Sequence, residues 1–485
     1  MKLKTLLLQT VVLSTLSLPP SLNAAGKGDL YNYKQLPNLQ LDFVNTRYQA
    51  YFHYNMCTFK NLNEEEHFGR STGKEPVSMF APTGLDCDQW AQVCKDARME
   101  GGWLTTKHHG GFCLWDSKFT TYDVGSARDK TDVVGEFVKA FRKAGLKVGL
   151  YYSILDYHHG IENGHVTQAE LDFMRSQIRE LLTNYGEIDY INFDGWSTWP
   201  TTPNFDDVNY GEILRLVKEL QPNCLIISHT YESNLAHAEV PFADAAGRKY
   251  PYHPDYFRPV AASDILQIDW WWDNNHKRLK KADYVLEQLE SYNSHNGVYI
   301  LNISPNPAGR IDEDAIGVLK EVASRWERPA DVKQPGKNWG YSYNVNKNKA
   351  FMKYATQSSM ADFIRDMRGH PRAEIAIDGI TEGLSEMEQT SITKRENNPW
   401  WRVNLGEETD INKITIYNCT DIYKPLLRNF TVEVWDAGGN VVWESHQKAC
   451  PDTVLKLRTG GVKGQYVHIK VHERSQLALA EVIVE

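Results

Sequence analysis

Short apolar runs rich in β-branched and aromatic residues alternate with amphipathic stretches between about residues 41 and 327. Regular alternation of this kind over roughly 290 residues favours an α/β fold with a (β/α)8 barrel, because each strand followed by a helix extends a parallel sheet that can close. The pattern predicts strands at 102–106, 148–153, 189–193 and 224–228, and helices at 132–144, 167–185 and 210–220.

The pattern changes after the predicted barrel, where a stretch rich in Pro, Gly and charge is typical of a linker. Beyond it, short alternating segments such as 413–417 and 430–435 are separated by turns, which indicates an all-β sandwich. We therefore predict a catalytic barrel over 25–330, a linker over 331–345 and a sandwich over 346–485.

The first residues have the order of a secretory signal: two lysines within residues 1–4, an apolar run over 5–18, and small residues near 24. We expect residues 1–24 to be a signal peptide and the protein to be exported, either periplasmic or secreted. The apolar run is too short to cross a bilayer, and no other segment approaches the ~18 apolar residues of a spanning helix.

Charge and composition narrow the partners further. The net charge is −9 and basic residues form no extended cluster, which argues against nucleic acid. The 14 Trp and 25 Tyr supply many flat aromatic faces of the kind on which sugar rings stack. The seven Cys lack metal-like spacing; Cys419 and Cys450 are a candidate disulfide, and the other five are expected to be buried small side chains.

Two adjacent histidines, His108 and His109, follow the strand predicted at 102–106. Active groups of a (β/α)8 barrel sit at the carboxyl ends of strands, so this is a candidate site. We expect the two imidazoles to point to different sides and to bind neighbouring hydroxyls of one sugar. A zinc site is the alternative, but no nearby HxxxH or Cys spacing supports one.

Asp194 directly follows the strand predicted at 189–193 and precedes Gly195. A carboxylate there, with a glycine that allows close approach, suits the nucleophile of a retaining glycosidase. An ordinary Asp-Gly turn is the alternative. The general acid would lie ~5 Å from the nucleophile, and the candidates past the next strand are Glu232, Glu239, Asp264 and Asp269.

The string "KHHGGFCLWDSKFTTY" at 107–122 resembles the "KHHDGFCLWxSKxTxY" of the α-L-fucosidases of glycoside hydrolase family 29. Residues 50–59 resemble the "FFHFGxNTFT" of the subgroup that prefers α-1,3/1,4-linked fucose, and "YILNISPNPAGRI" at 299–311 continues the match. The resemblance spans nearly the whole barrel. It implies a retaining exo-glycosidase that removes terminal α-L-fucose from glycans and needs no cofactor for catalysis.

Position by position, the resemblance implies that Asp194 is the nucleophile and that Trp115 forms a wall against the apolar face of the sugar. Glu239 falls nearest the acid/base of the branched-linkage subgroup, with Asp264 in reserve. The implied sugar-binding residues are His53, Glu66, His108, His109, Trp115 and Tyr151.

Two positions depart from the family pattern: Gly110 replaces the Asp of "HHDGF", and Asn192 replaces a usual Trp. They keep two alternatives open. One is a glycosidase for a related L-sugar such as an L-galactoside, and the other is a glycan-binding protein whose barrel has lost its acid.

The C-terminal region resembles the discoidin-like, factor 5/8 type C sandwich of carbohydrate-binding modules of family 32, through "NPWWRVNLG" at 398–406 and "LALAEVIVE" at 477–485. The resemblance implies a structural Ca²⁺ with Asp378 and Glu481 as ligands, and oxygen ligands suit this ion. An ion-free sandwich that braces the barrel is the alternative. Trp400 and Trp401 are expected in the core.

Overall fold

The computed structural model describes residues 29–60, 71–197, 200–228, 239–244, 256–272, 278–362 and 371–485. The predicted signal peptide, Glu66 and Glu232 lie outside these residues. Within the described ranges, no helix has the length and apolar character needed to cross a membrane.

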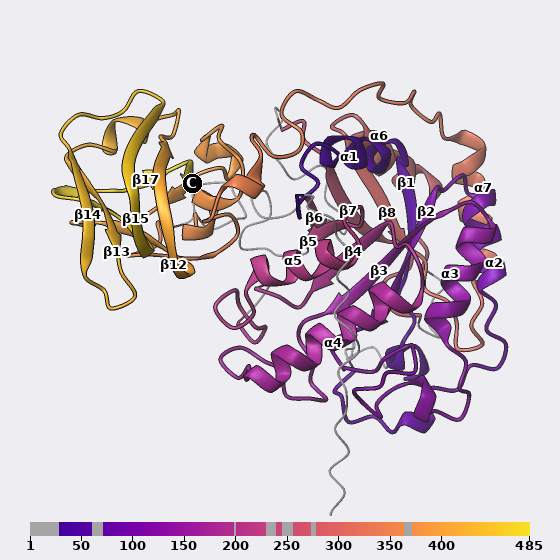
Figure 1. Ribbon diagram of the computed structural model, residues 1–485. Coiled ribbons are helices and arrows are strands. Elements are labelled where there is room, and N and C mark those ends of the chain that lie inside the picture. Colours follow the sequence, from indigo (N-terminus) through magenta and orange to yellow (C-terminus); the bar gives the residue numbers. More distant parts are fainter. Residues whose placement is uncertain are drawn as a thin grey trace, which may run out of the picture.

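Eight parallel strands form a closed barrel in chain order, as the sequence predicts (Figure 1). Neighbouring strands pair in sequence around the ring, and β8 closes it on β1 through pairs such as Ala50 with Leu301. The strands are β1 (Tyr48–Phe52), β2 (Gly101–Lys107), β3 (Lys147–Ser153), β4 (Tyr190–Asp194), β5 (Leu225–Ser228), β6 (Val240–Asp244), β7 (Val260–Ile265) and β8 (Gly297–Asn302).

Helices surround the barrel, and most begin at a side-chain cap. Asp132 accepts from the backbone N–H of Gly135 at 2.9 Å, and Thr167 and Glu170 form a reciprocal capping box. α1 precedes the barrel and covers its amino-terminal end, where Phe43 meets Tyr190 edge to face at 5.2 Å. The helices are α1 (Leu36–Asn45), α2 (Cys87–Asp96), α3 (Val133–Lys143), α4 (Gln168–Asn184), α5 (Tyr210–Leu220), α6 (Ala282–Asn293) and α7 (Glu313–Arg325).

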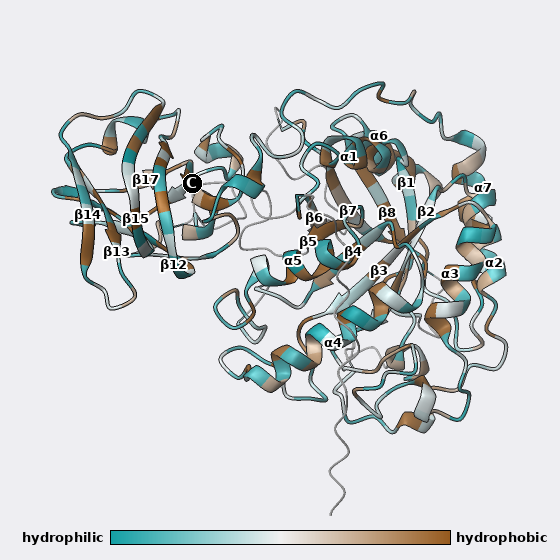
Figure 2. Ribbon diagram, in the orientation of Figure 1, coloured by the Kyte–Doolittle hydropathy of each residue, from teal (hydrophilic) through white to brown (hydrophobic). Residues whose placement is uncertain are grey.

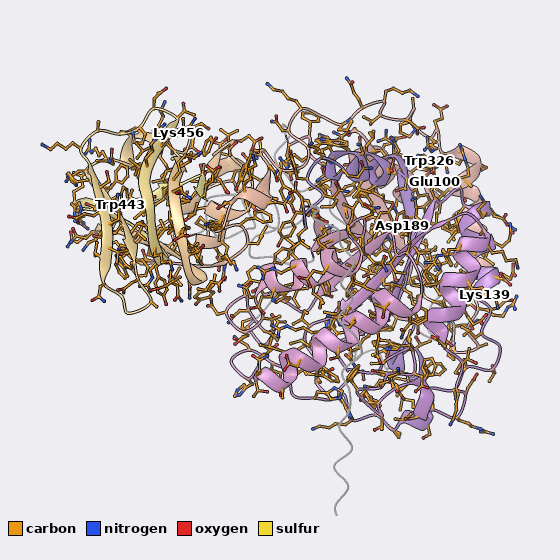
Figure 3. The ribbon with its side chains drawn as sticks, viewed as in Figure 1. Glu100, Lys139, Asp189, Trp326, Trp443 and Lys456 are labelled. Carbon is orange, nitrogen blue, oxygen red and sulfur yellow. The ribbon has the colours of Figure 1, made fainter. Side chains whose placement is uncertain are left out.

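Alternation along each strand separates two apolar layers. Residues of one parity fill the barrel interior, such as Trp103, Tyr190 and Ile300. Residues of the other parity pack under the helices, such as Leu104 and Ile191. Hydrophobic colour therefore concentrates on the strands and inner helix faces (Figure 2), while charged side chains such as Lys139 on α3 project into solvent (Figure 3).

The C-terminal domain is built on a six-stranded antiparallel sheet in the order β14-β13-β15-β12-β18, with β9 paired to β12. Two short two-stranded sheets, β10 with β17 and β11 with β16, complete it. The segment predicted at 413–417 is the second half of a much longer strand whose register shifts between Asn404 and Thr409. The strands are β9 (Tyr354–Gln357), β10 (Ser391–Ile392), β11 (Glu396–Asn397), β12 (Trp400–Tyr417), β13 (Phe430–Trp435), β14 (Val441–Gln447), β15 (Val454–Val471), β16 (Arg474–Ser475), β17 (Ala478–Leu479) and β18 (Glu481–Val484).

The structure tests three sequence predictions about this domain. Trp401 lies in the core, fully buried, with its indole N–H donating to the carbonyl of Ala373 at 2.8 Å. Trp400 does not: one position away on the same strand, it lies on the opposite face and is half-buried. The candidate disulfide is also wrong, since Cys419 and Cys450 are both free thiols.

Candidate active site

The carboxyl ends of the barrel strands bring together polar side chains that are far apart in sequence. His53 follows β1, and Ser153, Asp194 and Asn302 end β3, β4 and β8. Strand register places them at one level, because Ser153 pairs with Asp194 and Asn302 pairs with Tyr51. All share the inward parity, so they form the top layer of the barrel interior.

Asp194 is 7% exposed, and its two oxygens are held separately. The hydroxyl of Tyr151 on β3 donates to Oδ2 at 2.7 Å, and the backbone N–H of Gly195 donates to Oδ1 at 2.5 Å. The imidazole Nε2 of His109 lies 3.7 Å from Oδ2. The carboxylate therefore has a fixed orientation, with the imidazole of His109 beside it.

Gly195 is required at its position for two reasons. Its φ is +61°, a left-handed conformation that side chains other than glycine rarely adopt. A Cβ there would also lie 3.0 Å from Nδ1 of His109 and 2.9 Å from Oγ of Ser153. The glycine of "FDG" thus lets the backbone after β4 lie against Ser153 and His109.

His109 is oriented by a hydrogen-bond chain. The hydroxyl of Ser153 donates its one proton to the carbonyl of Leu155 at 2.6 Å, so at 2.7 Å it accepts from Nδ1 of His109. This assigns a proton to Nδ1 and turns Nε2 toward Asp194. The prediction that His108 and His109 point to different sides is wrong: both follow the end of β2, and their rings lie 4.0 Å apart at 49°.

The other two predicted histidines complete the cluster. Nδ1 of His53 donates to Oδ1 of Asn302 at 2.8 Å; the amide NH₂ of Asn302 donates to the carbonyl of Trp270 at 2.8 Å, which fixes the amide orientation. His108 stacks on Tyr151 at 5.7 Å with 12° between the rings. The structure therefore brings His53, His108, His109, Tyr151 and Asp194 into one site.

The aromatic wall of this site comes from a segment that the sequence analysis did not single out. Trp271 meets His108 edge on at 4.8 Å and His53 at 5.3 Å, and Trp270 lies 4.9 Å from His53. The run of three tryptophans at 270–272 was an available signal. Trp115, predicted as the wall, is instead fully buried, with its indole N–H donating to Glu180 on α4 at 2.9 Å.

Glu239, predicted as the acid/base, lies at the wrong end of the barrel. It precedes β6, and its Oε2 accepts from Nζ of Lys218 at 2.6 Å and from the N–H of Ile226 at 2.9 Å. Ile226 pairs with Ile191, three residues before Asp194 on β4, which is about 10 Å along a strand. A retaining pair needs about 5 Å between its carboxyl groups, so Glu239 is a structural ion-pair partner.

Asp264, the second candidate for the acid/base, is excluded because its side chain points away from the barrel interior. It has the outward parity on β7 and accepts at Oδ2 from the hydroxyls of Tyr284 at 2.8 Å and Tyr299 at 2.9 Å, with Lys280 at Oδ1. Asp269 lies on the loop after β7, 3% exposed, and accepts from the backbone N–H of Trp270 at 2.5 Å. It is the candidate carboxylate whose described position adjoins the wall of the site.

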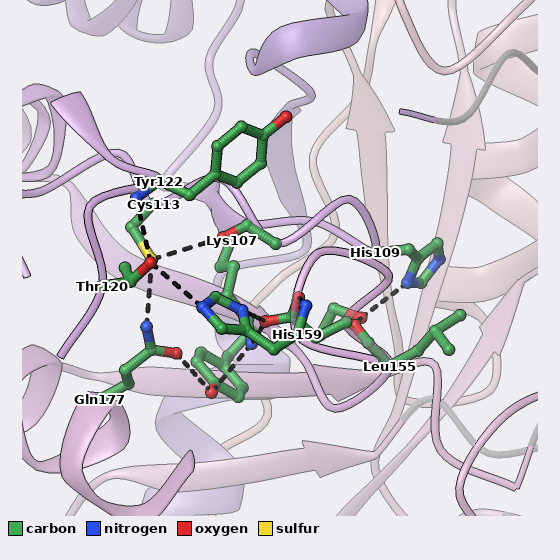
Figure 4. Close-up of polar contacts among 12 residues, drawn as sticks. Lys107, His109, Cys113, Thr120, Tyr122, Leu155, His159 and Gln177 are labelled. Atoms are coloured by element: carbon green, nitrogen blue, oxygen red, sulfur yellow. Dashed lines mark hydrogen bonds and ion pairs between the residues drawn. The ribbon is translucent and has the colours of Figure 1, made fainter. Parts of the chain in front are cut away.

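Behind the histidines lies a buried ion pair between Lys107 and Asp156, both with side chains 0% exposed and 2.9 Å apart (Figure 4). Nδ1 of His159 and the hydroxyl of Tyr152 extend the network, at 3.0 Å from Asp156 and from Lys107 respectively. Burial would raise the pKa of Asp156, but Lys107 and His159 bring it well below its ordinary value. The network ties the loop that carries His109 to the loop after β3.

The two departures from the family string are accommodated locally. A Cβ at Gly110 would lie 2.3 Å from Oγ of Ser71, so the neighbouring segment occupies the space of the missing Asp side chain. Ser71 in turn donates to Glu75 at 2.6 Å. Asn192, one layer below Asp194, donates to the carbonyl of Ile227 at 2.8 Å and accepts from the hydroxyl of Tyr51 at 3.2 Å.

The two carboxylates implied as calcium ligands do lie together in the C-terminal domain. Asp378 and Glu481 are 1% and 0% exposed, and burial raises the pKa of both well above the ordinary range, with Glu481 adding to the rise at Asp378. Among the described residues, Oδ2 of Asp378 has no hydrogen-bond partner. No cluster of three or more His, Cys, Asp or Glu suited to a metal occurs in the described ranges.

Fold and site together define a (β/α)8 barrel of the glycoside hydrolase class. The family model described as "Alpha-L-fucosidase" matches residues 21–328, and the chain therefore belongs to the α-L-fucosidase family. The model described as "NedA-like, galactose-binding domain" matches residues 375–469, within the C-terminal sheet domain.

Individual relatives agree. Alpha-L-fucosidase 1 of Arabidopsis thaliana is 31% identical over 290 residues, covering 53% of this chain and 56% of that protein. Tissue alpha-L-fucosidase of Homo sapiens is 27% identical over 251 residues, covering 46% and 49%. The chain thus spans about half the length of the curated relatives it matches.

Solved structures share the fold. A putative alpha-L-fucosidase from Bacteroides thetaiotaomicron superposes with a TM-score of 0.51 at 21% identity, covering 92% of this chain and 96% of that one. AlfC from Lactobacillus casei, in complex with alpha-L-fucose product, gives 0.51 at 22% identity, covering 60% and 97%.

Proposed function

We propose that this protein is a retaining exo-α-L-fucosidase that hydrolyses terminal fucose, α-1,3- or α-1,4-linked, from glycans. The observation that carries the proposal is Asp194, a buried carboxylate held by Tyr151 and Gly195 at the carboxyl end of β4, beside His109. A buried carboxylate held in one orientation suits attack on an anomeric carbon.

Each neighbour has a role in that reaction. The carboxylate of Asp194 attacks the anomeric carbon, and Tyr151 keeps it in the attacking orientation. His53, His108 and His109 present imidazole nitrogens to the sugar hydroxyls, with His53 fixed by Asn302. Trp271 closes the site with an apolar face that excludes water. Release of the covalent sugar by water then restores the free carboxylate.

The proton donor must come from the loops at the carboxyl ends of the strands, because Glu239 and Asp264 are directed elsewhere. We propose Asp269 for this role because it lies next to Trp270, which forms part of the aromatic wall of the site. Glu232 is the alternative, since it follows β5 in the chain. The donor protonates the leaving oxygen and then takes a proton from the attacking water.

The test is hydrolysis of 4-nitrophenyl α-L-fucoside and of Lewis-type trisaccharides by purified variants. Asp194→Ala should abolish release of fucose. With an aryl fucoside, azide should rescue the variant that lacks the acid/base, and the comparison of Asp269→Ala with Glu232→Ala names the residue. Glu239→Ala is the matched control that azide should not rescue.

Activity on an aryl L-galactoside above that on the fucoside would replace fucose by the related sugar. Wild-type protein that binds fucosylated glycans and releases nothing would instead make the barrel a binding domain. An unchanged rate in Asp194→Ala would overturn the assignment of the nucleophile.

We also propose that the C-terminal domain holds a structural Ca²⁺ through Asp378 and Glu481, supported by two buried carboxylates and an unpartnered oxygen. The ion would neutralise two charges whose burial is otherwise costly. Added Ca²⁺ should raise the melting temperature of the EDTA-treated protein, and Asp378→Asn should remove that response. No response in the wild type would favour the ion-free domain.

We propose that the protein acts after export, in the periplasm or outside the cell, where fucosylated glycoconjugates are accessible. The basic, apolar and small-residue order of the first residues supports this. Fractionation of the expressing cell, followed by N-terminal sequencing of the mature chain, tests it. Intact residues 1–24 on cytoplasmic protein would contradict it.

A further inference from the structure

The six-stranded sheet of the C-terminal domain has a second face, opposite the one that packs into the domain core. Alternation along β12, β13 and β15 sends Trp401, Val403 and Ile469 into the core. Their neighbours in sequence therefore face the other way. This set, called the outer face below, comprises Trp400, Arg402, Asn404, Thr431, Glu433, Trp435, Tyr466, His468 and Lys470.

Arg402 is at the centre of the outer face. Its guanidinium carbon lies 5.4 Å from the ring of Trp400, 5.3 Å from that of Trp435 and 5.6 Å from that of Tyr466. Three rings around one guanidinium hold it in place, because a cation is attracted to the negative face of an aromatic ring. The arginine is thereby positioned before any ligand arrives.

The two cations of the outer face lack acidic partners. No hydrogen bond or ion pair with another described residue involves the guanidinium of Arg402 or the ammonium of Lys470. The nearby carboxylate of Glu433 instead accepts from the indole N–H of Trp435 at 2.7 Å. Aromatic stacking satisfies the face of a guanidinium but leaves its N–H donors, which are directed in its plane, for an anion.

His468 lies beneath these rings, and its pKa is affected by the two cations. It is 6% exposed, its ring is 4.6 Å from Trp435 and 5.5 Å from Trp400, and its Nδ1 has no partner among the described residues. Burial, with added repulsion from Arg402 and Lys470, lowers the pKa of His468 to about 4. The neutral ring keeps the positive charge of the outer face on the two side chains that reach solvent.

We propose that the outer face binds an oligosaccharide that carries an anionic group, either a carboxylate or a sulfate. The indoles of Trp400 and Trp435 pack against the apolar C–H faces of sugar rings. The guanidinium of Arg402 binds the anionic group through paired N–H donors, and Lys470 adds a second charge. This site is separate from the barrel pocket and does not depend on the chemistry of Asp194.

The choice of an acidic sugar over a neutral one rests on charge complementarity. A neutral sugar would leave the in-plane donors of a half-buried guanidinium facing hydroxyls, whereas carboxylate and sulfate oxygens match the fork of Arg. The choice of a sugar over a protein anchor rests on the two indoles beside the guanidinium, whose flat faces suit the C–H faces of sugar rings. A second copy of this chain is the competing occupant.

The experiment is isothermal titration of the full-length protein with three matched probes: 3′-sialyllactose, 3′-sulfolactose and lactose. The first two test the carboxylate and the sulfate, and lactose tests the neutral ring. We expect at least one charged probe to bind about tenfold or more tightly than lactose. Added salt should weaken that binding, since it screens an exposed charge contact.

Variants locate the binding. Arg402→Gln should lower affinity for the charged probe at least about tenfold, and Trp435→Ala should weaken both charged and neutral probes. Arg458→Gln, on an exposed arginine of the neighbouring strand β15, is the matched control and should bind as wild type. Asp194→Ala should also bind as wild type, which separates this site from the proposed hydrolysis. Retained circular dichroism establishes that each variant is folded.

Three results would overturn the proposal: equal affinity for lactose and both charged probes, unchanged affinity in folded Arg402→Gln, or no binding of any probe. A concentration-dependent dimer in analytical ultracentrifugation that Arg402→Gln abolishes would also overturn it, because a second copy would then cover the outer face.

Discussion

Removing the charge of Asp156 tests how the histidine loop is held. Asp156→Asn keeps the size of the side chain and leaves Lys107 as an uncompensated ammonium in a position that is 0% exposed. At 2.9 Å and an effective dielectric constant of ~20, the lost Coulomb attraction is about 6 kcal/mol. Most of this attraction offsets the desolvation of the two ions, so the intact pair itself contributes little net stability.

The cost of the substitution therefore comes from the cation left behind. Lys107 would keep the hydroxyl of Tyr152 at 3.0 Å, the ring of Tyr152 at 4.2 Å and the ring of Phe173 at 5.7 Å. Releasing the proton instead, from an ordinary pKa of 10.5, costs about 5 kcal/mol at pH 7. In the variant, Lys107 should either stay charged or lose its proton, whichever costs less free energy. We expect the unfolding free energy of the barrel to fall by about 3 to 5 kcal/mol.

Urea unfolding of the wild type, Asp156→Asn, Lys107→Met and the double variant measures this as a cycle. The double variant should be less destabilised than the sum of the singles by about 2 kcal/mol or more, because it leaves no lone charge. Asp88→Asn is the control: it breaks an exposed pair with Lys143 at 3.2 Å and should cost under about 1 kcal/mol. Additive costs, or a loss at Asp156 as small as at Asp88, would refute the reasoning.

Three further predictions concern Gly195, Gly110 and His468. Gly195→Ala should cut kcat of fucoside hydrolysis at least about tenfold while the protein stays folded, because its Cβ would press on His109; wild-type kcat would contradict this. Gly110→Asp should lower the melting temperature, and the double variant with Ser71→Gly should regain part of it; a single variant as stable as wild type would show that the space is open. His468 has a lowered pKa, so the unfolded chain binds more protons between pH 6.5 and about 4, and stability of the C-terminal domain should fall over that range on acidification. Denaturant unfolding of His468→Gln should lack this component, and an identical pH profile would disprove it.

Much of the fold and part of the site follow from local pattern. Apolar runs and amphipathic stretches place four of the eight barrel strands and three of the helices within one residue of their limits. The strand ends identify Asp194 and His109 as candidate active groups. His109 follows β2 and Asp194 ends β4; both strands pair with β3, so the parallel sheet brings the two side chains together.

The wrong predictions for these site residues have a common cause: each depends on the end of the strand that the residue occupies or on the face to which its side chain points. Glu239 and Asp264 carry the right functional group near the right strands, but one precedes its strand and the other has outward parity. Trp115 belongs to the family string yet packs against α4, while Trp271 turns its ring toward His108. Which end of a strand a residue occupies depends on the strand limits, and which face it shares depends on one residue of register.

The sequence by itself determined the barrel, the sheet domain, the family and the candidate nucleophile, because these depend on periodicity and on a long contiguous string. Only the tertiary structure decided which carboxylates face the pocket, which tryptophans form its wall and that Arg402 stands unpaired among three rings. Those features join residues from separate strands and loops. Their geometry is set when the strands pair and the side chains pack, which no local pattern encodes.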